Sequence, residues 1–176
     1  SYVLKQNQII FVLTSPVGSN KKITSWLSLH GDGVCNIAIK VEDASDAFIK
    51  SCKNGAIGVL EPRTLTDSDG EVCISSIAVY GDVVHTFVDD KSYNGVWMPG
   101  FESSSIDSNC HKNPELLFID HIVANVEENK MEKWKNFYED AFGFSTFVKF
   151  DESDISNKYS SLKSVVVRSK NWKVKL

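Results

Sequence analysis

The sequence predicts an α+β fold built from a β-α-β-β-β plan that occurs twice. The first observation is an alternation of apolar and polar residues, which is typical of half-buried strands. The second is a repeat: residues 34–89 and residues 118–176 each read as one strand, one amphipathic helix and three further strands. With 176 residues, 42% of them apolar and 24% charged, the chain can form one large domain or two small ones.

The first residues predict part of a further module. Residues 1–16 alternate and are rich in Ile, Val and Phe, which predicts a β-hairpin that turns near Gln6. After a loop, residues 23–27 have the apolar spacing of a short helix. This helix is expected to end before the glycine-rich stretch HGDG, residues 30–33.

The first complete copy of the plan is expected at residues 34–89. A strand at residues 34–41 leads to Glu42 and Asp43, which open a helix because carboxylates stabilise the positive end of the helix dipole. Gly55 ends the helix as its C′ residue. Three strands follow, at residues 56–62, 71–81 and 82–89.

The second copy begins with an apolar run at residues 118–126, which predicts a strand. A helix follows, with apolar residues at i, i+3 and i+7 between Met131 and Phe142, and Gly143 ends it. Strands are then expected at residues 144–150, 159–169 and 171–176.

A connector separates the two copies. It is rich in Gly, Pro, Ser and Asn and has no period, so a domain boundary is expected there. The N-terminal domain, residues 1–116, would then hold a partial first module, a second module and the connector, at residues 1–30, 31–90 and 91–116. Residues 117–176 would form the first module of a second domain.

One imidazole in the second copy is a candidate metal ligand. Aligning Val41 with Val126, the last residues of the two first strands, pairs Asn36 with His121. On a strand, the side chain of His121 would point into the concave side of a curled sheet, and Asp120 would lie on the opposite face. From the residues alone a core histidine is favoured over a ligand, since lone histidines are seldom ligands.

The other three histidines are expected to have no catalytic or metal-binding role. His85 lies among apolar neighbours on an expected strand, so a structural core position is predicted. His30 precedes a glycine-rich stretch that lacks the GxGxxG spacing of a phosphate-binding loop, so a tight turn is expected. His111, in the connector, is expected to be solvated.

Composition excludes several classes of function. The net charge is −4 without a basic stripe, so nucleic acid is not an expected partner. No apolar run approaches the roughly 20 residues that a membrane helix needs. The cysteines form no CxxC pair, which argues against a structural zinc site and favours reduced thiols in a cytoplasmic protein. They are Cys35, Cys52, Cys73 and Cys110.

The motifs together resemble one family along nearly the whole chain. In order they are SYVLKQ with FVLTSP, HGDGVCNIAIKVEDA, YGDVVHTFV, PGF, IDHIVANV, WKNFYE, FDESDIS and YSSLKSVVVRS. The chain resembles the 4-hydroxyphenylpyruvate dioxygenases of the vicinal oxygen chelate superfamily. The resemblance implies β-α-β-β-β modules that curl into half-barrels. The family's residues before SYVLKQ and after NWKVKL have no counterpart here, so the chain resembles a fragment that is incomplete at both ends.

The resemblance also implies a chemistry. The family holds one Fe(II) ion with two histidines and a glutamate, and His121 matches the first histidine. Ser164 matches a serine that lines the substrate pocket. The implied reaction converts 4-hydroxyphenylpyruvate and O₂ to homogentisate and CO₂ in tyrosine and phenylalanine catabolism. Because two of the three ligands are missing, the chain alone is expected to be inactive.

Two alternatives stay open. Hydroxymandelate synthase uses the same substrate and iron but oxidises a different carbon. A non-catalytic ligand-binding module of the same superfamily is a more distant possibility. The family is commonly oligomeric, so a homo-oligomer is a further expectation, although nothing in the sequence fixes the state.

Overall fold

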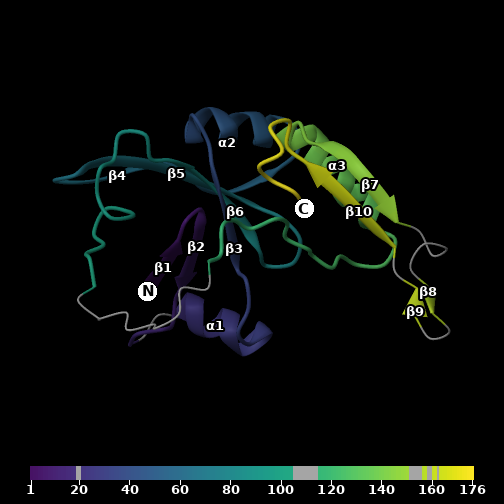
Figure 1. Cartoon of the computed structure of the whole chain (residues 1–176), viewed down its shortest axis with the longest axis horizontal. Helices are drawn as coiled ribbons and strands as arrows, with labels where there is room; N and C mark the ends of the chain where they lie inside the picture. The colour runs from purple at the N-terminus through teal and green to yellow at the C-terminus, as the bar shows by residue number, and fades with distance from the viewer. Residues whose placement is uncertain (19–20, 105–114, 151–155, 158–159, 162) are drawn as a thin grey trace.

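The computed structural model describes residues 1–18, 21–104, 115–150, 156–157, 160–161 and 163–176 (Figure 1). Its central element is a four-stranded sheet with two helices packed along one face. In the described part of the chain, no helix is both long enough and apolar enough to cross a lipid bilayer.

The N-terminal hairpin forms as predicted. Strands β1 (Tyr2–Gln6) and β2 (Ile9–Leu13) pair antiparallel, with Gln6 opposite Ile9. The turn places Asn7 at a φ of 49°, a left-handed conformation that asparagine tolerates better than most residues. Helix α1 (Lys21–His30) follows and runs slightly further than expected, because it includes His30 and ends where Gly31 takes a φ of 68°.

The first β-α-β-β-β copy is confirmed. It consists of β3 (Asn36–Lys40), α2 (Ala44–Lys53), β4 (Ile57–Asp67), β5 (Gly70–Ala78) and β6 (Val84–Asp89). The strand order is β3-β6-β5-β4, in which β3 runs parallel to β6 and the other neighbours are antiparallel. β3 is shorter than the predicted strand, so Cys35 lies outside it and is exposed.

Strand β4 is longer than predicted because proline does not end it. The sequence placed the end at Pro62, whereas the strand continues to Asp67. β4 is an edge strand, and its pairing with β5 shifts register between Leu60 and Arg63. A residue without an N–H group is tolerated at such an irregular edge.

Helix α2 begins and ends as its sequence indicates. The carboxylate of Asp43 accepts the backbone N–H groups of Ser45 and Asp46 at 2.8 and 2.9 Å. These bonds satisfy donors that the first turn would otherwise leave free. After the helix, Gly55 takes a φ of 95°. The helix packs on β4, β5 and β6, and the buried core beneath it consists of Ala44, Ala56, Ile77 and Phe87.

Helix α3 (Met131–Phe142) lies beside α2 and shares this core. The hydroxyl of Ser51 donates to the carbonyl of Ala141 at 3.2 Å, and Phe137 and Phe142 pack against the core cluster. The aromatic stripe is therefore a packing surface, as predicted. It covers the sheet of the first copy as well as β10 (Ser164–Arg168) and β7 (Ser145–Phe150), which pair antiparallel. Two short strands, β8 (Ser156–Asn157) and β9 (Ser160–Ser161), pair with each other.

Two predicted strands of the second copy are wrong. Residues 118–126 form no strand, and residues 171–176 contribute only an isolated bridge between Arg168 and Lys175. In the first copy β6 gives β3 its ladder of hydrogen bonds. Here the residues in the place of β6 fold back on β10, where Val167 and Leu176 exchange two backbone bonds at 2.9 and 3.0 Å. The described backbone hydrogen bonds join residues 118–126 to that segment at one place, from Ile122 N–H to Lys175 O at 3.1 Å.

Candidate functional site

His121, the predicted metal ligand, lies on an extended segment and forms a pair with its neighbour in the chain. Its Nδ1 lies 2.8 Å from Oδ2 of Asp120, and Nζ of Lys175 lies 2.5 Å from the other carboxylate oxygen. The imidazole side chain is 56% exposed. The expectation that Asp120 and His121 face opposite ways is wrong. The alternation of a strand does not apply here, since these residues have no strand ladder.

This arrangement orients the imidazole. The hydrogen bonds from Lys175 and then from His121 hold the pKa of the Asp120 carboxyl below its usual range, so the group is ionised at neutral pH. An ionised carboxylate only accepts, so Nδ1 of His121 carries the hydrogen and donates it. In the neutral ring this tautomer leaves the lone pair on Nε2, the atom that could bind a metal ion. A carboxylate behind a histidine is also the usual support of a metal-binding imidazole.

Ser164, the predicted substrate-binding residue, opens β10 and pairs with Phe150 of β7. Its side chain is half-buried, and Val166 lies two residues further along the same strand. Leu162, which was expected to share this face, lies outside the described residues. The structure gives no contact between Ser164 and His121, so it does not bring the two predicted residues together.

The described residues contain part of a metal site at most. Among them, no group of three or more His, Cys, Asp and Glu side chains could hold a metal ion. His121 has the features of one metal ligand, because a hydrogen bond fixes its Nδ1 and its ring is accessible. One imidazole is a weak and unselective ligand, since affinity comes from several ligands placed together.

Asn36, the counterpart of His121 in the first copy, belongs to a row of polar side chains. Its Nδ2 donates to Oγ1 of Thr86 at 2.9 Å, and Thr86 shares a 2.8 Å hydrogen bond with Ser76. The row crosses β3, β6 and β5. Ser75, one residue along, points the other way and donates to the carbonyl of Ala44 in α2. Asn36 therefore lies on the sheet face that α2 does not cover.

His85 lies in the core, as predicted. It is fully buried, and its Nε2 shares a 2.8 Å hydrogen bond with the hydroxyl of Tyr138 on α3. The ring of Phe142 meets it edge-on, with centroids 5.7 Å apart. Burial lowers the pKa of His85 to about 4 and raises that of Tyr138. Both groups are neutral at physiological pH, and they tie α3 to the sheet of the first copy.

His30 has a partner that the sequence did not reveal. Its Nε2 lies 2.7 Å from Oδ2 of Asp82, in the turn between β5 and β6, and its ring packs on Trp26 with centroids 4.7 Å apart. After His30 the chain bends at Asp32, where a tight turn was predicted. The pair was missed because 52 residues separate its members. His111 and Cys110 lie outside the described residues, and the described cysteines are free.

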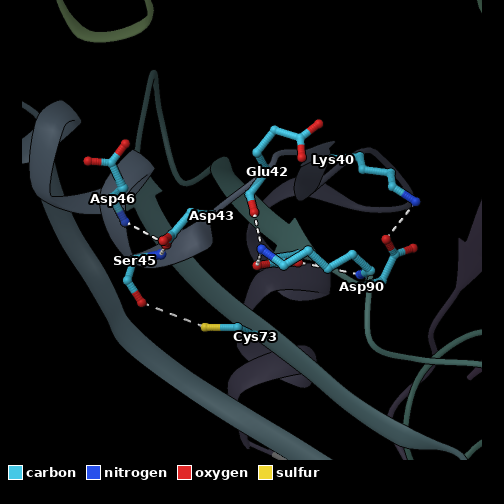
Figure 2. A network of polar contacts seen from close by, with 9 residues as sticks. Lys40, Glu42, Asp43, Ser45, Asp46, Cys73 and Asp90 are labelled. Carbon is cyan, nitrogen blue, oxygen red and sulfur yellow. Dashed lines mark hydrogen bonds and ion pairs between the residues drawn. The ribbon is translucent and has the colours of Figure 1, made fainter.

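A second polar network lies where β3 and β6 end (Figure 2). Lys40 pairs with Asp90 at 2.6 Å, and Lys91 binds both the carbonyl of Glu42 at 2.8 Å and the carboxylate of Asp89 at 3.2 Å. The hydrogen bond that Lys91 donates to the Asp89 carboxylate raises the pKa of Lys91. These contacts fasten the start of the connector to the end of β3. Because β3 and β6 run parallel, they end at the same edge of the sheet and bring these charges together. The separation of these residues in the sequence therefore gave no sign of this network.

Comparison with known proteins links the chain to one group. No family model matches it. It is 40% identical to a 4-hydroxyphenylpyruvate dioxygenase of Dictyostelium discoideum over 181 aligned residues, which cover all of this chain and 49% of that protein. A protein of the same name from Aspergillus fumigatus is 37% identical, again over the whole chain and 48% of the relative. The chain thus spans about half the length of the curated relatives it matches.

Solved structures agree on the fold. A mutant of 4-hydroxymandelate synthase from Streptomyces coelicolor matches with a TM-score of 0.80 at 17% identity, covering 98% of this chain and 48% of that one. A fusion of a xylose isomerase-like barrel with a 4-hydroxyphenylpyruvate dioxygenase matches with a TM-score of 0.65 at 20% identity, over 98% of this chain and 25% of the fusion. The α+β fold predicted from the repeat is confirmed, and the chain is similar to 4-hydroxyphenylpyruvate dioxygenases over about half of their length.

Proposed function

We propose that this chain is part of an Fe(II)-dependent dioxygenase that converts 4-hydroxyphenylpyruvate and O₂ to homogentisate and CO₂, a step of tyrosine and phenylalanine catabolism. The observation that carries the proposal is the similarity along the whole chain to proteins named 4-hydroxyphenylpyruvate dioxygenase, at 32–40% identity. The remaining half of such a protein would complete the site.

In this proposal His121 is one of three iron ligands. Its support is the match of IDHIVANV to the family and the hydrogen bond that fixes its Nδ1 on Asp120. Asp120 would hold the ring and its tautomer, and Lys175 would hold Asp120 in turn. A site of two histidines and one carboxylate leaves positions open for a keto acid and O₂, and the bound iron supplies the oxidising chemistry.

Ser164 is proposed to line the substrate pocket. A hydroxyl can donate one hydrogen bond and accept others, which suits a keto acid. Its position at the start of β10, half-buried and opposite Phe150, is compatible with a wall residue that other parts of the protein cover.

We further propose a cytoplasmic protein that acts on a small keto acid and O₂ and that self-associates into a homo-oligomer. Residues 1–116 would be the non-catalytic domain, and residues 117–176 the first module of the catalytic one. The free thiols of the described cysteines suit a reducing compartment. Sedimentation of the intact protein tests the oligomer.

The experiment compares oxygen uptake by two polypeptides, each with Fe(II) and 4-hydroxyphenylpyruvate. The intact protein is expected to consume O₂, and the 176-residue chain alone is expected to be inactive because it supplies one ligand. In the intact protein His121→Ala should abolish uptake, whereas the matched change His30→Gln should leave it. Turnover by the 176-residue chain, or by His121→Ala, would refute the assignment.

The same assay separates two other candidates. Hydroxymandelate as the product would identify a hydroxymandelate synthase, whose fold this chain shares. Stoichiometric binding of the keto acid without oxygen uptake by the intact protein would identify a non-catalytic binding module instead.

A further inference from the structure

A cleft of about 310 Å³ lies where three segments meet, and neither His121 nor Ser164 lines it. One wall is the end of α1, another is the turn between β5 and β6, and the third is residues 125–127. These segments belong to both halves of the chain. Small-molecule sites are often found at such junctions, and this volume is at the lower end of their usual range.

The charged groups of the cleft are mainly acidic. Asp82 and Glu127 line it, and no lysine or arginine is among the described residues that do so. The pKa of Glu127 is held below its ordinary value, first by its own backbone N–H, so this carboxylate is ionised at neutral pH. The positive charges of Lys130 and Lys133, at the start of α3, also lower the pKa of Glu127. Neither lysine lines the cleft.

Two aromatic side chains, Trp26 and Tyr80, are among the lining residues, and each packs against a neighbouring ring. Trp26 packs on His30, and a Cβ atom built on Gly33 would lie only 3.2 Å from its ring, so the chain passes close behind it. Tyr80 meets the ring of Trp134 edge-on, with centroids 5.5 Å apart. Fixed rings of this kind can present their negative faces to a cation without losing side-chain entropy.

We propose that this cleft binds a small organic cation, namely an ammonium or quaternary ammonium group on a short apolar body. The carboxylates of Asp82 and Glu127 attract the charge, and the rings of Trp26 and Tyr80 contact the alkyl groups and the cation. An anion is disfavoured by the same carboxylates. A metal ion does not fit, because His30, Asp82 and Glu127 do not form a group that could hold one. The proposal is independent of the dioxygenase assignment.

The test uses choline and its uncharged carbon analogue, 3,3-dimethylbutan-1-ol, as probes of the purified protein. The indole N–H signal of Trp26 is followed by ¹H–¹⁵N NMR and assigned with Trp26→Phe. Choline should shift this signal in a saturable way, and the neutral analogue should bind about tenfold more weakly, since a cation–π contact and a carboxylate are lost. Equal binding of both probes, or no saturable shift with choline, would overturn the proposal.

Three variants locate the binding. Asp82→Asn keeps an acceptor for His30, and Glu127→Gln keeps the size of the side chain, so each removes charge with little change of shape. Each should weaken choline binding by about tenfold, the effect of about 1.4 kcal/mol. Glu71→Gln removes an exposed carboxylate outside the cleft and should leave binding unchanged. Choline binding that survives both cleft variants, or that falls equally in Glu71→Gln, would exclude this site.

Discussion

Acidification should destabilise this protein through one buried imidazole. His85 is neutral in the folded state because burial lowers its pKa from 6.5 to about 4. When the chain unfolds, the imidazole returns to its ordinary pKa and takes up a proton as the pH falls. Its contribution to stability is therefore fully present above pH 6.5 and is lost progressively as the pH falls toward 4.

The size of the effect follows from the two pKa values. A difference of about 2.5 pKa units corresponds to about 3.5 kcal/mol, at about 1.4 kcal/mol per unit. Of this, about 1 kcal/mol should be lost between about pH 7 and about pH 5.5, before most carboxylates begin to titrate. Because the ring of His85 is fully buried, solvent screens little of the free-energy cost of protonating it.

The assay is urea unfolding followed by tryptophan fluorescence at several pH values in this window. His85→Gln is the matched variant, because glutamine is neutral at every pH and can still bond Tyr138. It should be less stable overall but should lose less stability on acidification than the wild type. Identical pH dependence of the free energy of unfolding in both proteins would refute the reasoning.

Three further changes test the packing described above. Tyr138→Phe leaves Nε2 of the buried His85 without its partner and should cost about 1–3 kcal/mol of unfolding free energy in urea titrations. Phe87→Ala removes a core ring that is 2% exposed and should cost about 3–5 kcal/mol, measured in the same way. Burial and then a hydrogen bond to Asp67 raise the pKa of Tyr93 to about 12, so Asp67→Asn should lower it. Ultraviolet titration of the phenol would show this, and an unchanged midpoint would count against the bond.

Local signals in the sequence predicted the elements whose stability is local. Helix α2 follows from Asp43 at its start and Gly55 at its end, and both act within one turn of the helix. The prediction of a strand at residues 118–126 was wrong because a strand depends on contacts that are distant in the sequence. Its apolar pattern suits a strand, but a strand also needs a neighbour, and the pattern carries no information on whether residues 171–176 provide one.

In the candidate site, too, the sequence revealed local features but not the contacts between distant residues. The sequence singled out His121 through the repeat and the family motif, but not the hydrogen bonds that join it to Asp120 and Asp120 to Lys175. The second bond spans 55 residues and depends on how the chain after β10 folds back. Likewise, the apolar stripe of α3 predicted a packed helix without revealing that Tyr138 would meet His85 of the first copy.

The most direct test of the proposed function is the Fe(II) content of the intact protein after anaerobic loading and gel filtration. The account predicts about one iron per chain in the wild type, loss of iron in His121→Ala, and an affinity about 10–100-fold weaker in Asp120→Asn, because Asp120 orients the ligand. Stoichiometric iron retained by a folded His121→Ala protein would contradict it.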